Sequence, residues 1–201
     1  WSVFVKDLKT GEVLSIDPDE KMISASIIKI FIAGAYYDAV EKNIISPDYD
    51  ETVRNMIVYS DNTATNELID LIGIDNINIF ISENGFSANT SLNRKMLESG
   101  TENFTTVKDC ADALEAIYNG TYVNSSASGK IQRFLLKQES KNKIPSGVYS
   151  VDANAVVANK TGEIGGNDMG SYVVGDAAIV YGSAANDDFI ITADCKMKLH
   201  T

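Results

Sequence analysis

Two copies of one short motif in this chain combine residue types that can perform nucleophilic chemistry. A serine followed three residues later by a lysine occurs at Ser26 and Lys29, and again at Ser140 and Lys143. A serine can act as a nucleophile when a base removes its proton, and a lysine one helical turn away can be that base if burial keeps it partly neutral. The spacing alone does not choose between the two copies.

The surroundings of the two copies differ. Ser26 begins an almost uncharged run, "SIIKIFIAGAYYDAVEKN", in which Lys29 would lose its water and the start of a helix would favour an anionic oxygen. Ser140 lies in "KQESKNKIPSG", which we interpret as a solvated polar loop. The context favours the first copy, although on this motif alone Ser26 could be a simple helix cap and Lys29 a lysine whose amine reaches back to water.

The tetrapeptide "KTGE" also occurs twice, at residues 9–12 and 160–163. The first copy separates two stretches of alternating apolar and polar residues, which is typical of the tip of a β-hairpin. The second copy follows an alternating stretch, so Lys160 and Thr161 are expected on a strand, beside a Gly162 that leaves room for a ligand. Taken alone, the second copy could equally be the end of a strand.

Helical patterns dominate the middle of the chain, and the elements that they predict would position these motifs. We expect a helix over 26–43 that is apolar nearly all round and therefore buried, followed by a short helix that ends near Tyr59. The tripeptide "SDN" at 60–62 then lies at a junction between helices, where by itself it is typical of a cap. Further helices are expected over "TATNELIDLIG" at 63–73, from Asp75 to "ENG", from the Thr106 and Asp109 capping pattern to Gly120, and over 126–138. A loop is expected across 87–104.

Strand patterns occur at both ends of the chain. The stretch "WSVFVKDLKTGEVLSID" predicts the hairpin, and "NAVVANKTGE", "SYVVGDAAIVYG" and "DDFIITADCKMK" predict three antiparallel strands. This order predicts an α/β fold, an α+β sandwich in which both chain ends build one antiparallel sheet packed against a mostly helical lobe. We expect a single domain over 1–201, with sheet parts at 1–20 and 150–198 and a helical part at 24–140.

The composition limits the classes of function. The chain has 201 residues and a net charge of −11, from 28 acidic and 17 basic residues, without a basic run. Nucleic acid and anionic membranes are therefore poor partners. The single histidine, His200, lies next to the C-terminus, so neither a metal site nor a histidine-based serine triad is expected. Cys110 and Cys195 could pair or stay as free thiols, and the sequence does not decide.

The three motifs together form a more specific signal. Ser-x-x-Lys at Ser26, Ser-Asp-Asn at Ser60 and Lys-Thr-Gly at Lys160 follow one another in this order. This set is typical of class A β-lactamases and penicillin-binding proteins, and the chain resembles that family from the opening hairpin to the last strand. The resemblance implies an enzyme, a penicillin-recognising serine hydrolase without cofactor or metal. It also implies that the first "KTGE" is a turn and that the second lines the site.

The resemblance assigns the catalytic residues. Ser26 would be the nucleophile that attacks the carbonyl of a β-lactam or of a D-alanyl-D-alanine amide. Lys29 would be the base or proton shuttle, and Ser60 would pass a proton to the leaving nitrogen. Asn62 would hold the amide of the substrate's side chain, and Asp61 would brace the loop from behind. Which base deprotonates the serine stays open.

The resemblance also assigns the substrate-binding strand. Lys160 and Thr161 would hold the substrate's carboxylate, and Gly162 would let the strand lie close to the ligand. The backbone amides of Ser26 and Glu163 would form the oxyanion hole, in which the loss of one donor costs on the order of a hundredfold or more in rate.

One departure from the family pattern concerns release of the acyl group. Class A β-lactamases usually carry, a little beyond an arginine, a glutamate that activates the deacylating water. In "TSLNRKMLESGTENFTT", Arg94 matches the arginine, but Met96 stands where that glutamate belongs. Efficient hydrolysis is therefore in question unless Glu98 or Glu102 substitutes from a shifted loop, which we do not favour because loop carboxylates are usually only solvated.

The resemblance therefore leaves three functions open: a β-lactamase, a D,D-peptidase or penicillin-binding protein, and a β-lactam sensor that does not hydrolyse. The family usually has a helix before the first strand and another after the last, whereas this chain begins in one strand and stops soon after another. We expect either a fragment of a longer exported protein or a sheet face covered by something else, for which another copy of the chain in a homo-oligomer is one candidate. Export to the bacterial cell envelope or the extracellular space is implied by the resemblance alone.

Overall fold

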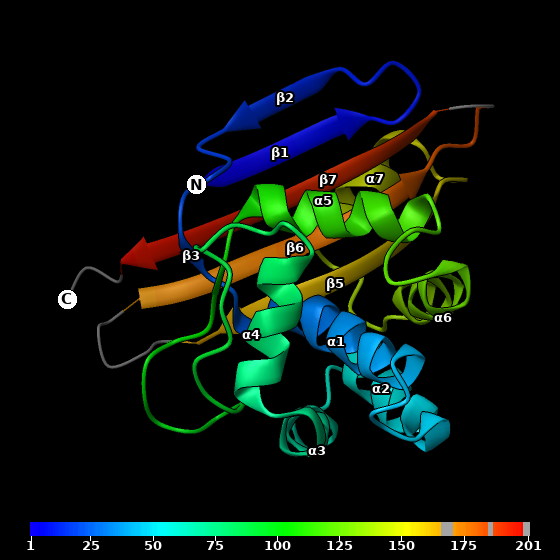
Figure 1. Cartoon of the computed structure of the whole chain (residues 1–201). Helices are drawn as coiled ribbons and strands as arrows, with labels where there is room; N and C mark the ends of the chain where they lie inside the picture. The colour runs from blue at the N-terminus through cyan, green and yellow to red at the C-terminus, as the bar shows by residue number, and fades with distance from the viewer. Residues whose placement is uncertain (166–170, 185–186, 199–201) are drawn as a thin grey trace.

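Five antiparallel strands form the main sheet, in the order β2-β1-β7-β6-β5. The computed structural model describes residues 1–165, 171–184 and 187–198, so His200 lies outside the described residues. Two strands come from the start of the chain and three from its end, which confirms the predicted sheet (Figure 1). The strands are β1 (Ser2–Asp7), β2 (Val13–Ile16), β5 (Val156–Ile164), β6 (Ser171–Tyr181) and β7 (Asp188–Lys198).

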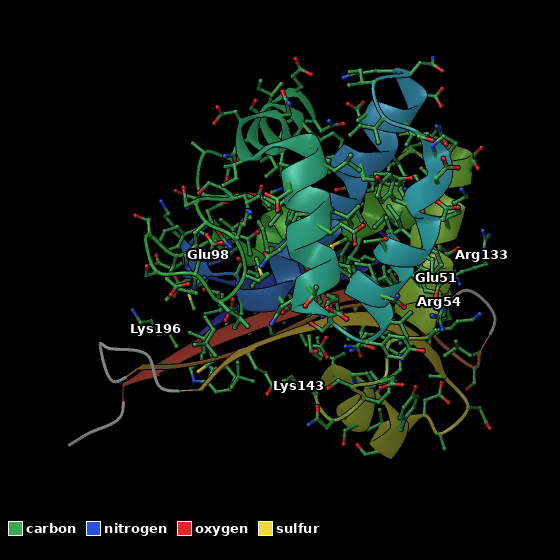
Figure 2. The ribbon with its side chains drawn as sticks, turned by 90° about the horizontal axis from the view of Figure 1, so that it is seen from below. Glu51, Arg54, Glu98, Arg133, Lys143 and Lys196 are labelled. Atoms are coloured by element: carbon green, nitrogen blue, oxygen red, sulfur yellow. The ribbon has the colours of Figure 1, made fainter. Side chains whose placement is uncertain are left out.

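The helical lobe covers one face of this sheet, and the short helix α7 lies on the opposite face (Figure 2). The helix α1 passes through the lobe and is buried nearly all round, as its small number of charged residues predicts. The helices are η1 (Ala25–Ile28), α1 (Lys29–Glu41), η2 (Pro47–Tyr49), α2 (Asp50–Val58), α3 (Asn62–Ile72), α4 (Ile74–Glu83), α5 (Val107–Tyr118), α6 (Ser125–Leu136) and α7 (Ile144–Val151). The short strands β3 (Met22–Ile23) and β4 (Phe104–Thr105) form a second, two-stranded sheet.

The first "KTGE" forms the turn between β1 and β2, as the alternating pattern predicts. The carboxylate of Asp7 accepts hydrogen bonds from the backbone N–H groups of Lys9 and Thr10, both at 2.8 Å. Gly11 follows with a φ of 75°, a left-handed conformation that glycine adopts without steric cost. This copy therefore shapes a hairpin at the edge of the sheet.

The structure differs from the sequence-based expectation at α7. Residues 144–151 form a helix where we expect the end of a polar loop, and β5 begins only at Val156. Pro145 lies in the first turn of this helix, where the absence of an N–H group costs little. The backbone N–H of Ile144 donates to the buried carboxylate of Asp176 at 3.1 Å, so a contact distant in the sequence holds the start of the helix.

Two questions that the sequence leaves open concern the thiols and the uncovered face of the sheet. Cys110 and Cys195 are both buried and both free, so they do not form a disulfide. On β2, the apolar side chains of Leu14 and Ile16 are 64% and 53% exposed. A homo-oligomer formed through this part of the sheet stays a prediction.

No helix in the described part of the chain is long and apolar enough to cross a membrane.

Candidate active site

Ser26 lies inside the tight turn η1 that leads into α1. The residue at the N-cap of η1 is Ser24, and its side chain makes no capping hydrogen bond. The interpretation of Ser26 as a simple helix cap is therefore wrong. Ala25, immediately before Ser26, has a φ of 44°, a left-handed conformation that is costly for a residue with a Cβ atom. Strain of this kind is often found at functional sites, where the surrounding structure enforces it.

Two facing glycines allow this turn to lie directly on the sheet. Gly162 on β5 and Gly175 on β6 are register partners. A Cβ atom on Gly162 would come within 2.9 Å of the Ser24 carbonyl oxygen, and one on Gly175 would come within 2.8 Å of Cδ1 of Ile27. Contact between the sheet and η1 therefore explains Gly162 without a ligand, and its expected role beside a substrate stays a prediction.

Lys29 occupies the first turn of α1 and is fully buried. Its Nζ atom donates hydrogen bonds to the Ser60 carbonyl oxygen at 2.8 Å, to Oδ1 of Asn62 at 2.8 Å and to the Ser60 hydroxyl at 3.2 Å. Burial lowers the pKa of Lys29 from 10.5 to about 7, although the nearby charge of Asp61 opposes the shift. The interpretation of Lys29 as a lysine that reaches back to water is therefore wrong, and the amine is partly neutral near neutral pH.

Ser60 lies between two buried lysines. Nζ of Lys160, from β5, donates to the Ser60 hydroxyl at 2.9 Å and to the Thr161 carbonyl oxygen at 2.8 Å. Burial, together with the charge of Lys29, lowers the pKa of Lys160 well below its ordinary value. Ser60 itself has a φ of 56°, so this non-glycine residue is also in the left-handed region. The structure thus brings motifs from three distant stretches of the chain together around one hydroxyl group.

The remaining residues of the Ser-Asp-Asn tripeptide hold this junction. The carboxylate of Asp61 accepts hydrogen bonds from the backbone N–H groups of Thr63 at 2.7 Å and Ala64 at 3.0 Å, and so caps α3. Asn62 is the first residue of α3 and directs its Oδ1 atom to Lys29. The tripeptide is therefore a helix cap, and the same cap places Ser60 and Asn62 beside the lysine.

A small hollow of about 80 Å³ lies beside the nucleophile candidate. Its walls include Ser26, Asn62 and Glu163, together with Arg94, Met96, Leu97 and Glu102 from the loop between α4 and β4. Lys160 and Thr161 are not among the residues that line it. The Thr161 hydroxyl accepts a hydrogen bond from Nε2 of Gln138 at 3.1 Å, and both side chains are buried. The expected role of Thr161 toward a substrate carboxylate stays a prediction.

The loop that carries Met96 is closed by polar contacts. Nη2 of Arg94 donates to Oε2 of Glu102 at 2.5 Å. The Asn66 amide holds both backbone groups of Met96: the Met96 N–H donates to Oδ1 at 2.7 Å, and Nδ2 of Asn66 donates to the Met96 carbonyl oxygen at 3.1 Å. Glu102 therefore lies at the hollow in an ion pair, whereas Glu98 is exposed on the outside of the loop (Figure 2).

Asn66 and Gln138 are site contacts that the sequence does not single out. Asn66 lies within α3 and Gln138 follows α6, and neither belongs to a recognisable local pattern. Their hydrogen bonds join residues 30 and 23 positions apart in the chain. A local pattern in the sequence carries no sign of pairs at such separations.

Comparisons with known proteins agree with this fold. The model of the β-lactamase enzyme family matches residues 1–54 and 48–198. The β-lactamase of Sphaerobacter thermophilus is 24% identical, with a TM-score of 0.83 over 98% of this chain and 82% of that chain. PBP-A is 25% identical, with a TM-score of 0.81 over 95% of this chain and 78% of that chain. A PBP-A variant in an acyl-enzyme complex with penicillin G is also 25% identical, with a TM-score of 0.81 over 95% of this chain and 79% of that chain.

No curated protein matches the chain in a sequence search. The structural similarity to the Sphaerobacter enzyme, at 24% identity, concerns the fold. The family model, by contrast, matches the sequence itself along almost its whole length. The chain therefore belongs to the β-lactamase enzyme family.

Proposed function

We propose that this protein is a penicillin-recognising serine hydrolase in which β-lactams acylate Ser26. The observation that carries the proposal is the hydrogen-bonded chain from Lys29 through the Ser60 hydroxyl to Lys160, at 3.2 Å and 2.9 Å. A neutral amine one helical turn from a serine can accept its proton, and burial makes Lys29 such an amine near neutral pH. A variant of PBP-A, a structural relative, was solved as an acyl-enzyme complex with penicillin G, and this supports the same reaction here.

The proposed acylation needs only groups that this chain supplies. The Ser26 hydroxyl oxygen forms a bond to the lactam carbonyl carbon, and its proton passes to the neutral amine of Lys29. The lactam C–N bond then breaks, and the leaving nitrogen takes a proton from the Ser60 hydroxyl. Ser60 recovers its proton from the lysine that gained it, since Lys29 lies within hydrogen-bonding distance. The proton that Ser26 loses is thus the one that the nitrogen gains, and an ester at Ser26 remains.

The remaining site residues would bind and orient the substrate. Lys160, with its amine at Ser60, would attract the substrate's carboxylate, assisted by Thr161. Asn62, which lines the hollow, would hold the substrate's side-chain amide. The backbone N–H groups of Ser26 and Glu163 would donate to the oxyanion, and both residues line the same hollow.

A second candidate function follows from the loop. Met96 lines the hollow beside Ser26, and its side chain cannot activate water. An acyl-enzyme that forms but is not hydrolysed is the behaviour of a penicillin-binding protein, a D,D-peptidase relative or a β-lactam sensor. The natural substrate would then be a D-alanyl-D-alanine peptide, and the β-lactam would be its mimic. Because both ligands belong to cell-wall chemistry, we expect the protein to act at the bacterial cell envelope or outside the cell.

The deciding experiment is intact mass spectrometry of the protein over time after mixing with penicillin G. We expect the mass to increase by one penicillin and the adduct to persist, with the modified peptide containing Ser26. An adduct that decays while hydrolysed penicillin accumulates over many equivalents would instead identify a working β-lactamase. The absence of any adduct, with this penicillin and with a second β-lactam class, would contradict the proposed function.

The acylation rate is expected to rise with pH through neutrality. Because burial lowers the pKa of Lys29 to about 7, the neutral amine dominates above that pH and is lost below it. Each pH unit below about 7 should reduce the acylation rate about tenfold, as the fraction of neutral base falls. Second-order acylation rate constants measured from about pH 5 to about pH 8 test this expectation.

The variant Asp61→Asn provides the matched control for that profile. The Asp61 charge raises the pKa of Lys29, and asparagine can still cap α3. Removing the charge should therefore shift the midpoint of the profile to lower pH. A rate that is independent of pH across this range would exclude Lys29 as the base.

A further inference from the structure

An ion pair outside the three motifs lies at the rim of the hollow. Nζ of Lys143, the residue before α7, pairs with Oε1 of Glu163 on β5. The side chain of Lys143 is 14% exposed and that of Glu163 is 45% exposed. Figure 2 labels Lys143 near the edge of the sheet, beside α7. A half-exposed glutamate side chain and a mostly buried lysine side chain therefore form an ion pair beside Lys160 on the same strand, β5.

The negative charge of the Glu163 carboxylate would oppose the proposed reaction if it were unpaired. Glu163 lines the same hollow as Ser26 and lies three residues beyond Lys160 on β5. The penicillins, and peptides that end in D-alanine, carry an anionic carboxylate that Lys160 would hold. An unpaired negative charge at Glu163 would repel that carboxylate, because like charges at close range in a partly desolvated site interact strongly.

Lys143 is placed to cancel this charge. The backbone N–H of the next residue, Ile144, donates to the carboxylate of Asp176 at 3.1 Å. Asp176 is buried and is held in turn by Nδ2 of Asn159 at 3.0 Å. The ammonium group of Lys143 thus extends from a fixed point of the backbone. The charges of Lys143 and Glu163 also act on Lys160 in opposite directions, since the former lowers and the latter raises its pKa.

We propose that Lys143 is a positioning residue that neutralises Glu163 and thereby makes the site selective for substrates with an anionic carboxylate beside the scissile amide. This inference rests on the proposed function, because it concerns the substrate of the same site. Lys143 acts through Glu163 and does not need to contact the substrate. Removing the charge of Lys143 should therefore lower the acylation rate with negatively charged substrates. The rate with uncharged analogues of the same shape should not fall.

The test compares penicillin G with its methyl ester, which has the same ring system but no negative charge. Second-order rate constants for acylation are measured for the wild-type protein, Lys143→Met, Glu163→Gln and the double variant. Lys143→Met should lower the rate with penicillin G by about tenfold and leave the rate with the ester within about twofold. The double variant should recover most of that loss. Glu163→Gln alone should raise the rate with penicillin G, because Lys143 then adds a net positive charge.

The hairpin copy of "KTGE" provides matched controls. Lys9→Met and Glu12→Gln make the same charge changes at exposed positions of the β1–β2 turn, and neither should alter the ratio of the two rates. Added salt should reduce the difference in the penicillin G acylation rate between Lys143→Met and the wild-type protein, because salt screens the repulsion between Glu163 and the substrate's carboxylate. The intact mass of each variant after the reaction confirms a single adduct.

The outcomes separate this inference from the proposed function. If the wild-type protein is acylated, and Lys143→Met lowers the acylation rates with penicillin G and with its ester equally, then Lys143 has only a structural role and the inference is wrong. The inference is also wrong if the double variant is as slow with penicillin G as the single variant. If the wild-type protein forms no adduct with penicillin G or its ester, the proposed function itself has failed.

Discussion

The variant Ser26→Ala is expected to form no adduct with penicillin G under conditions in which the wild-type protein is fully labelled. Alanine removes the hydroxyl oxygen that forms the ester in the proposed reaction, so Lys29 and Ser60 no longer have this nucleophile to activate. The covalent product should be absent, and not merely formed more slowly. Intact mass spectrometry measures it directly, because one bound penicillin changes the mass of the whole chain.

The second Ser-x-x-Lys copy supplies the matched control for this result. The Ser140 hydroxyl donates to Oδ1 of Asn142 at 3.0 Å, and Lys143 is held by Glu163. Ser140→Ala removes the same atom from the same motif, and labelling should proceed as in the wild-type protein. An adduct on Ser26→Ala would place the nucleophile elsewhere and contradict the proposed mechanism. Unchanged far-ultraviolet circular dichroism would show that the variant is folded.

Much of the fold could be predicted because its signals are local. The alternating residues on both sides of the first "KTGE" predict the hairpin, and the mostly apolar run from residue 26 predicts the buried helix. The Thr106 hydroxyl accepts a hydrogen bond from the Asp109 N–H at 2.9 Å, as the capping pattern predicts. In each case, the residues that determine the structure are within a few positions of one another.

The parts that could not be predicted depend on contacts between distant residues. The start of α7 is held by Asp176, which is 32 positions away from Ile144. The approach of η1 to the sheet requires Gly162 and Gly175 to face each other, and only the strand register places them there. The position of Ser60 between Lys29 and Lys160 arises in the same way, although the resemblance to a family leads to these residues before the geometry is known.

The variant Met96→Glu is expected to convert a persistent acyl-enzyme into one that is hydrolysed. The Asn66 amide holds the N–H and the carbonyl of Met96, so the backbone has a fixed position that a substitution should preserve. The Met96 side chain is 7% exposed and lines the hollow beside Ser26. A carboxyl group placed there loses water, which raises its pKa and makes it a stronger base for a water that attacks the ester.

The expected effect is a decay of the adduct faster by about a hundredfold or more, the usual contribution of a general base. Met96→Gln is the matched control, because glutamine has nearly the same shape as glutamate but cannot accept the proton. The lifetime of the adduct, followed by intact mass after removal of free penicillin, measures the effect. If glutamate and glutamine give the same lifetime, Met96 does not lie where a deacylating base must act.

A wild-type adduct that already decays rapidly would shift the role of the base to Glu102. This carboxylate lines the same hollow as Ser26 and forms an ion pair with Arg94. Glu102→Gln would then lengthen the lifetime of the adduct, and Met96→Glu would add little, because a base would already be present. If the wild-type adduct instead persists, Glu102→Gln should leave the lifetime of the adduct unchanged. The pair of variants therefore distinguishes a site that lacks a deacylating base from one that carries it at Glu102, the hydrogen-bond partner of Arg94.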